Sequence, residues 1–221
     1  MNSYINNHHT SSVVAPVIKD RDLCGVSCAE STSILLESPS CTLRNNPGRA
    51  VGKVATGVNI QSIGCWNIRT LADNSRSSCP ERKTALLAKE FHRYGLGIIA
   101  LSETRNEGQG HMVEKLPEAT YHFHWSGKPP EDRRESGVGF AIKDSIAKHL
   151  VDSPVGHNDR IMSMRLNIGR SRHLTIVSVY APTMQSDQGI KERFYEQLRC
   201  VLNKVQQSDK LILLGDFNAR V

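Results

Sequence analysis

The chain has 221 residues, of which 38% are hydrophobic and 5% aromatic, a length and composition that suit one domain with an additional tail. The net charge of +6 and the pI near 9.1 permit a polyanionic partner such as nucleic acid but do not require one. The six cysteines form no CxxC pair and no Cys/His spacing of a zinc site. No apolar run is long enough for a signal core or a membrane span. We therefore expect reduced thiols in an intracellular protein that is not secreted and has no membrane association.

Residues 1–59 are predicted to form a disordered, low-complexity tail. They are rich in Ser, Thr, Asn and Gly, and apolar runs such as Ser33-Ile34-Leu35-Leu36 are too short to build a core. The neighbouring His8 and His9 suit either an accidental pair or a loose metal site. We expect order to begin near Asn59, so that residues 60–221 form the folded domain.

A strand, a helix and a second strand are the first predicted elements. Residues 60–67 and 97–103 are expected to be strands, and the second is apolar enough to be buried. Ser78, Pro80 and Glu81 between them match the cap and first turn of a helix. Elements in this order form a right-handed crossover, which places both strands in one sheet.

From Thr120 onward the pattern is that of strands bounded by turn residues. Residues 121–126, 137–143, 160–168 and 173–180 are expected to form an antiparallel meander. An amphipathic helix then spans residues 190–205 and leads into a last strand. Four consecutive apolar residues, 211–214, predict that this strand is buried on both faces.

Polar side chains stand where four of these apolar runs end. They are found in Trp66-Asn67, Ser102-Glu103-Thr104, Tyr180-Ala181-Pro182-Thr183 and Gly215-Asp216-Phe217-Asn218. Ligand chemistry in open α/β sheets lies at the carboxyl ends of strands. Mg²⁺ takes one or two carboxylates and leaves its other positions to water and phosphate oxygens. Glu103 is therefore the predicted direct metal ligand, with Asn67 beside it.

The last motif suits the chemistry of phosphodiester hydrolysis. The reaction needs a metal to neutralise developing charge, a group that orients or deprotonates water, and donors for the phosphate oxygens. Asp216 and Asn218 lie two apart, so they share a face of the strand while the backbone stays extended. Asp216 suits the water, Asn218 suits the phosphate, and Tyr180 can donate through its hydroxyl.

Each candidate also has a structural alternative. The residues around Asp216, like Asn67, can be turn residues, Glu103 can pair with Arg105 or Arg69, and Tyr180 can belong to the core. His122 and His124 alternate with aromatic residues and suit a metal site, a stacking surface or a half-exposed strand. The basic loop of Lys128, Arg133 and Arg134 suits phosphate contact or simple solvation.

In their order and their amino-acid sequence the four motifs resemble the endonuclease/exonuclease/phosphatase superfamily. This superfamily includes abasic-site endonucleases, deoxyribonuclease I and endonuclease domains of non-LTR retrotransposons. The sequence of residues 61–221 is most similar to RTE-type retrotransposon endonucleases and craniofacial development protein 2-like proteins. The resemblance implies an α/β fold, a DNase I-like four-layer sandwich. It also implies hydrolysis of DNA with Mg²⁺, or Mn²⁺, as cofactor, and hence a nuclear location. It identifies no protein partner.

The resemblance further assigns roles to residues. It implies that Asn67 and Glu103 bind the metal, that Tyr180 lies on the phosphate side, that Asp216 aligns or deprotonates the water and that Asn218 stabilises the transition state. Thr183 stands where many relatives have Asn, and its hydroxyl can still bind substrate.

Relatives continue past this motif to a terminal Ser-Asp-His motif, so we expect a sandwich that is incomplete at its C-terminus and has weak or no activity. The alternatives are a non-catalytic nucleic-acid-binding or remnant fragment, and a phosphoesterase acting on inositol phosphate or phospholipid.

Overall fold

The computed structural model describes residues 60, 62–72 and 82–218, and the predicted tail and the predicted cap at Ser78, Pro80 and Glu81 lie outside these residues. In chain order the elements are β1 (Ile63–Asn67), α1 (Lys83–Arg93), β2 (Ile98–Ser102), β3 (Gln109–Lys115), β4 (Thr120–Ser126), β5 (Val138–Lys143), α2 (Asp144–Ala147), β6 (Val155–Gly156), β7 (Ile161–Gly169), β8 (Arg172–Tyr180), α3 (Gln188–Asn203) and β9 (Lys210–Asp216). Over the described residues, no helix has the length and apolar content that crossing a membrane requires.

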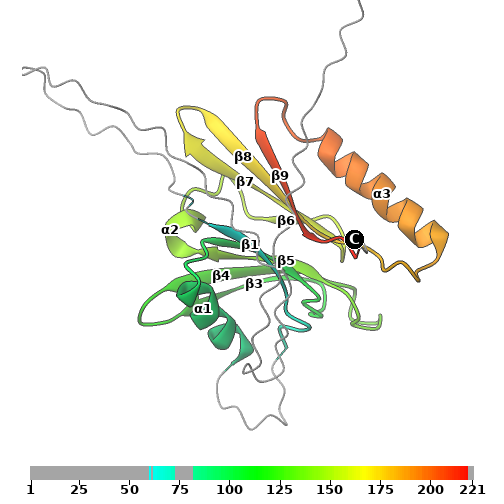
Figure 1. The fold of residues 1–221 in the computed structure, drawn as a ribbon, viewed down its shortest axis with the longest axis horizontal. Helices are drawn as coiled ribbons and strands as arrows, with labels where there is room; N and C mark the ends of the chain where they lie inside the picture. The colour runs from blue at the N-terminus through cyan, green and yellow to red at the C-terminus, as the bar shows by residue number, and fades with distance from the viewer. Residues whose placement is uncertain (1–59, 61, 73–81, 219–221) are drawn as a thin grey trace, which may run out of the picture.

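Two β-sheets packed face to face form the centre of the molecule, and a helix covers the outer face of each (Figure 1). The strand order is β1-β2-β5-β4-β3 in the first sheet and β6-β7-β8-β9 in the second. Helix α1 packs on the first sheet and α3 on the second. The four-layer α/β sandwich predicted from the sequence is thereby confirmed.

Alternation along the central strands creates three apolar cores. In β2, Ile98 and Ala100 face the core between the sheets, whereas Ile99 and Leu101 face the core under α1. Successive side chains of a strand leave opposite faces, so one apolar run can serve two cores. Strand β8 connects the core between the sheets with the core under α3 in the same way.

The first part of the chain folds as its pattern predicts. Strands β1 and β2 pair in parallel, with Ile63 opposite Ile98 and Asn67 opposite Ser102. Helix α1 connects them and packs Leu87 on the sheet. The parallel pairing is what brings the carboxyl ends of β1 and β2 to one edge.

The predicted single meander is wrong, because its strands are divided between the two sheets. β4 pairs with β5 and β7 with β8, both antiparallel, but β5 lies between β2 and β4 in the first sheet. The segment between β5 and β7 contains α2 and β6 and carries the chain into the second sheet. Strand β3 was not predicted from the sequence; only Glu114 in it is buried, so it lacks an apolar alternation.

The prediction that the last strand is buried on both faces holds only in part: Leu214 lies in the core between the sheets and Leu213 packs against the core under α3, but the start of the strand is exposed. Strand β9 pairs in parallel with β8 alone among the described strands, so it lies at the edge of its sheet. Leu211 is 43% exposed, and Leu214 is the one residue of β9 that is classed as buried. Edge position, which local hydrophobicity does not encode, accounts for the difference.

Candidate functional site

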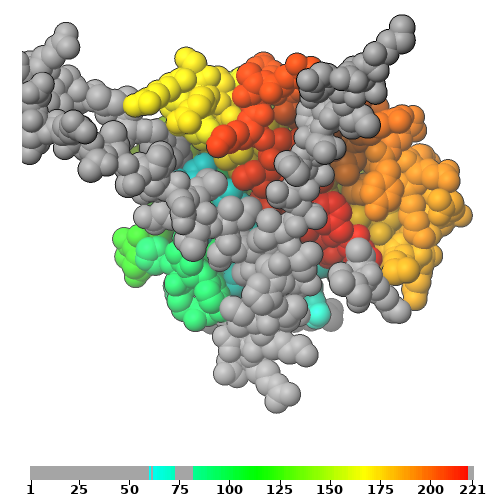
Figure 2. Space-filling view, turned by 45° about the horizontal axis from the view of Figure 1, so that its top comes forward, coloured from blue at the N-terminus to red at the C-terminus, as the bar shows by residue number. Residues whose placement is uncertain are grey.

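The carboxyl ends of four strands meet at one end of the sandwich. β1 and β2 are parallel neighbours in one sheet, and β8 and β9 are parallel neighbours in the other. β1 and β9 contact each other across the two sheets, and Figure 2 shows their surfaces together on one face. Asn67, Tyr180 and Asp216 are the last residues of β1, β8 and β9, and Glu103 directly follows β2. Residues from both sheets are therefore brought to one site.

The side-chain amide of Asn67 joins the two carboxylates of the site. Its Nδ2 donates to Glu103 Oε1 at 2.8 Å and to Asp216 Oδ2 at 3.3 Å. The two carboxylate oxygens consequently lie no farther apart than the sum of these distances. Two negative groups held this close, one from each sheet, suit a shared cation.

Tyr180 lies beside this pair and keeps its proton. Its side chain is largely buried, and its hydroxyl donates to Glu103 Oε1 at 3.4 Å. Burial, followed by the negative charge of Glu103, raises the pKa of Tyr180 to about 12, although the guanidinium of Arg160 opposes the shift. The Tyr180 hydroxyl is thus a hydrogen-bond donor at neutral pH.

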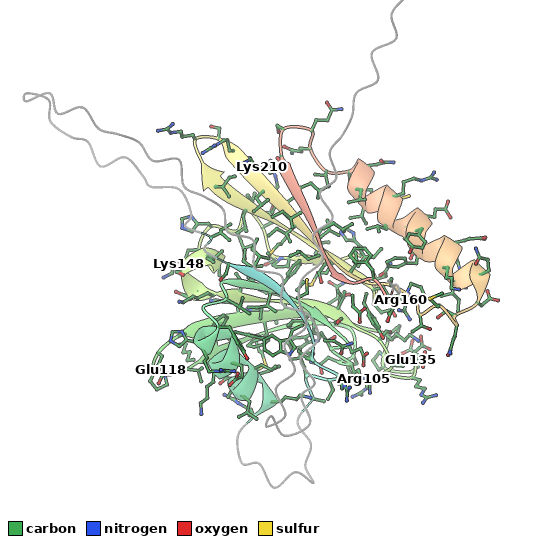
Figure 3. The ribbon with its side chains drawn as sticks, in the orientation of Figure 1. Arg105, Glu118, Glu135, Lys148, Arg160 and Lys210 are labelled. Carbon is green, nitrogen blue, oxygen red and sulfur yellow. The ribbon has the colours of Figure 1, made fainter. Side chains whose placement is uncertain are left out.

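Glu103 also makes the ion pair that the sequence left open. Arg105, and not Arg69, is its partner: Arg105 Nη2 lies 2.7 Å from Glu103 Oε2. Both Glu103 and Arg105 have left-handed backbones, with φ of 56° and 53°. Such conformations are unfavourable for residues other than glycine and gather at functional sites. Figure 3 shows Arg105 at the same end of the molecule as Arg160.

Asn218 contacts the cluster through its backbone alone, and Thr183 lies outside it. Asn218 has φ of 48°, so the chain turns after β9, and the extended backbone on which a shared face with Asp216 depended does not reach Asn218. Its backbone N–H donates to Asp216 Oδ1 at 3.0 Å, and its Nδ2 donates to the carbonyl of Ala181 at 2.6 Å. Thr183 is exposed and pairs with Ser186 Oγ at 3.1 Å. The residues after β9 therefore form a turn, as the structural alternative predicted, and Asp216 nevertheless belongs to the cluster.

Arg160 is a neighbour of the site that the sequence did not indicate. Its guanidinium lies 5.1 Å from the ring centroid of Tyr180, and its Nη1 donates to the Tyr180 carbonyl at 3.2 Å. Its position in the turn before β7 gives no sequence signal, because charged residues are common in such turns. Pairing of β7 with β8 is what brings it to Tyr180.

The donor set fits a hard divalent cation. The described residues contain no group of three His, Cys, Asp or Glu side chains arranged to hold a metal, so an all-protein cage is not present among them. Mg²⁺ does not need one, since one or two carboxylates with water and phosphate oxygens satisfy it. Glu103 and Asp216 supply carboxylate oxygens, and Asn67 fixes both of them.

Sequence comparison agrees with this arrangement. Craniofacial development protein 2 of Bos taurus is 28% identical over 159 residues, which are 72% of this chain and 24% of that protein. The Tragulus javanicus protein of the same name is also 28% identical, over 72% of this chain and 25% of its own length. The chain thus spans about a quarter of these relatives. The model of the Endonuclease/Exonuclease/phosphatase family matches residues 64–221, which include all four clustered residues, and the chain belongs to that family.

Proposed function

We propose that this chain carries the site of a Mg²⁺-dependent phosphodiesterase that hydrolyses DNA. The observation that carries the proposal is the double hydrogen bond of Asn67 Nδ2 to Glu103 and Asp216, which holds two carboxylates from two sheets at one point. Members of this family are nucleases and phosphatases, and both reactions transfer a phosphoryl group to water.

Each residue of the cluster has a role in that reaction. Glu103 would hold the cation and Asn67 would keep the Glu103 carboxylate in place for it; the cation would neutralise the charge that develops on the phosphate. Asp216 orients the attacking water and takes its proton, and Asn67 keeps the Asp216 carboxylate in place. The protonated Tyr180 hydroxyl donates to a phosphate oxygen. The side-chain amide of Asn218 also donates to the phosphate once its hydrogen bond to the Ala181 carbonyl is broken.

DNA is the proposed substrate because the chain is basic overall and an exposed arginine lies beside the site. The chain has a net charge of +6, and Arg105 is 44% exposed beside Glu103. Arg133 is 90% exposed in the loop between β4 and β5 and touches Glu135 only at 3.9 Å. Arg133 is available to a phosphate, and Arg105 could reach one by exchanging its ion pair with Glu103.

Nicking of supercoiled plasmid tests the proposal. With protein in excess over plasmid, we expect Mg²⁺ or Mn²⁺ to give open circles and EDTA to prevent them. Asp216→Asn should slow nicking by about 10² or more, because a positioned base contributes roughly 10²- to 10⁴-fold. Glu103→Gln should raise the Mg²⁺ concentration that half-saturates the reaction.

Glu118→Gln is the matched control, since this exposed carboxylate lies at the other end of the molecule (Figure 3). It should nick as the unchanged chain does. Equal rates for Asp216→Asn and the unchanged chain, or no metal-dependent nicking by the latter, would overturn the proposal. Hydrolysis of an inositol phosphate or phospholipid without nicking would reassign the substrate.

A further inference from the structure

A network of buried hydrogen bonds joins the two sides of the sandwich next to the carboxylate site. Ser136, which lies shortly before β5, is 1% exposed, and its hydroxyl donates to Asp159 Oδ2 in the segment before β7. Ser126, the last residue of β4, is also 1% exposed, and its hydroxyl donates to the carbonyl of Asn158 at 2.8 Å. Two buried hydroxyls on the side of the first sheet thus bind one short segment that leads into the second sheet.

The second sheet and its helix hold the same segment from the other side. Asn158 Nδ2 donates to Gln197 Oε1 of α3 at 3.0 Å, and Asn158 Oδ1 accepts from the backbone N–H of Arg160 at 2.7 Å. The carbonyl of Arg160 accepts from the backbone N–H of Tyr180 at 2.9 Å. Paired polar groups in a buried setting favour one arrangement, because a buried group that loses its partner is destabilising. Residues 158–160 are therefore a firm support for the side chain of Arg160.

Asp159 supplies the opposite charge for that side chain. Arg160 Nε lies 3.8 Å from Asp159 Oδ2, the same oxygen that accepts from Ser136, and the Arg160 and Asp159 side chains are only 22% and 23% exposed. The guanidinium lies over the ring of Tyr180, and its Nη1 donates to the Tyr180 carbonyl. A cation over the face of a tyrosine is attracted by the ring, more strongly where water is excluded. Asp159 is thus one residue removed from the side chain that faces Glu103.

We propose that Asp159 is a positioning residue for phosphodiester hydrolysis: held by Ser136, it keeps the guanidinium of Arg160 over the ring of Tyr180 and thereby keeps the Tyr180 hydroxyl beside Glu103. The inference rests on the function proposed above. No hydrogen bond or ion pair joins Asp159 to Glu103 within the described part of the chain, so Asp159 acts through Arg160 and Tyr180. The tie also holds the two sheets in register where the site is formed.

A competing carboxylate explains why Arg160 needs this anchor. Glu135 is exposed, interacts electrostatically with Arg160 and lies at the same end of the molecule (Figure 3). A guanidinium that is no longer held by Asp159 is attracted toward Glu135, because opposite charges attract over several ångströms near the surface. The ring of Tyr180 then loses the contact over its face, and its hydroxyl is no longer held beside Glu103.

A double-mutant cycle in the plasmid-nicking reaction tests the proposal. Asp159→Asn keeps the size of the side chain and removes its charge. We expect kcat to fall roughly tenfold or more while KM for plasmid stays within about twofold, because a misplaced donor lowers the rate more than the binding. In the Tyr180→Phe background, Asp159→Asn should change kcat by less than about twofold, since no hydroxyl is left to position. A merely structural role would give the same loss in both backgrounds.

NMR separates this inference from the function on which it rests. Tyrosine labelled with ¹³C at Cζ gives one resonance for each of the five tyrosines, and Tyr180→Phe identifies the resonance of residue 180. Without metal or DNA, Asp159→Asn should move this resonance. Ser136→Ala, which removes the hydrogen bond to Asp159 but keeps its charge, should move it in the same direction by less.

Asp152→Asn is the matched control, since this exposed carboxylate lies between α2 and β6; it should nick as the parent does and leave the resonance in place. Circular dichroism verifies that each variant is folded. If the parent itself does not nick plasmid, the proposed function fails, whereas the resonance still tests how Tyr180 is held. An unchanged kcat in Asp159→Asn, equal losses in the two backgrounds, or a Tyr180 resonance that neither Asp159→Asn nor Ser136→Ala moves would each overturn the proposal.

Discussion

The position of Asp216 depends on the residue before it. Gly215 has φ of 139°, and a Cβ at this position would come 1.9 Å from the carbonyl oxygen of Val179 in β8. The Val179 carbonyl is part of the backbone of β8, so it cannot move away as a flexible side chain would. We expect Gly215→Ala to lower the free energy of unfolding by roughly 3 kcal/mol, measured by urea denaturation, because strain and overpacking add.

Gly95→Ala separates these two contributions. Gly95 has φ of 67°, but a Cβ there would meet nothing within 4 Å. Gly95→Ala should therefore lower the free energy of unfolding by about 1 kcal/mol, which is the strain of a left-handed backbone alone. Equal losses in the two variants would show that β8 accommodates the methyl group and that Gly215 is not required for close approach.

His124 makes the fold sensitive to acid. Burial, followed by the neighbouring His111 and His122, lowers its pKa from 6.5 to about 4. Below pH 6.5 the His124 imidazole takes up a proton in the unfolded chain, whereas in the folded chain it takes one up only near pH 4. The free energy of unfolding should therefore fall between these pH values, by up to about 3 kcal/mol from this group.

Urea denaturation at pH 7 and pH 4.5 measures this effect. His124→Gln should lose less stability between the two pH values than the unchanged chain does, because glutamine takes up no proton. His92→Gln should keep the full difference, since it leaves His124 in place. An undiminished difference in His124→Gln would assign the acid sensitivity to other groups.

Among the elements, β9 is the one whose placement matters most for the site, and one buried ion pair anchors its start. The side chain of Asp209 is 1% exposed and accepts from Arg165 Nε at 2.7 Å, from Arg165 Nη2 at 2.9 Å and from Thr175 Oγ1 at 2.8 Å. Arg165 belongs to β7 and Thr175 to β8. A slip of one residue in β9 would turn Asp216 away from Asn67, so this contact protects the register.

Asp209→Asn should therefore lower the free energy of unfolding by about 2 kcal/mol, since charge-assisted bonds are lost and Arg165 is left without its partner. Urea denaturation is the measurement. Glu196→Gln, an exposed carboxylate on α3, should leave stability unchanged. If Asp209→Asn proves as stable as the parent, apolar packing of β9 alone sets its register.

Elements with long apolar runs were the predictable ones. Residues 97–103 were expected to be a buried strand, and β2 is buried at all five positions. Strand β3 escaped prediction because Met112 and Val113 are adjacent and its other residues are polar or glycine. The edge position of β9 could not be inferred, since it depends on which strands lie beside it and not on its own residues.

The same limit applies to the site. Asn67 with Glu103, and Tyr180 with Asp216, could each be predicted as a pair because carboxyl ends of neighbouring parallel strands converge. The bonds of Asn218 depend on a backbone that turns to φ of 48° just after the strand, and periodicity does not encode such turns. Loop conformation decided where these polar groups point.

At the scale of the whole molecule, the site exists only because two sheets are held together. Asn67 and Glu103 come from the first sheet, and Tyr180 and Asp216 come from the second. Local pattern identified most of the strands but could not assign them to sheets, because the crossing through α2 and β6 has no apolar period. The resemblance of four motifs in order carried that information instead.

The layers should unfold as one unit. Strand β2 contributes to the cores on both of its faces, as does β8, so no core can lose its packing without affecting its neighbour. The two tryptophans of the chain, Trp66 and Trp125, report on the α1 side, whereas Leu198 lies in the core under α3. Leu198→Ala should cost about 3 kcal/mol.

In a cooperative molecule, this loss shifts the urea midpoint equally in tryptophan fluorescence and in far-ultraviolet circular dichroism, although the substitution lies on the far side of the second sheet. Leu87→Ala, in the same core as Trp66, provides the comparison and should shift both signals in the same way. A fluorescence midpoint that stays in place for Leu198→Ala would mean that α3 and its sheet unfold separately. The carboxylate site, built from both sheets, would then be lost before the α1 layer melts.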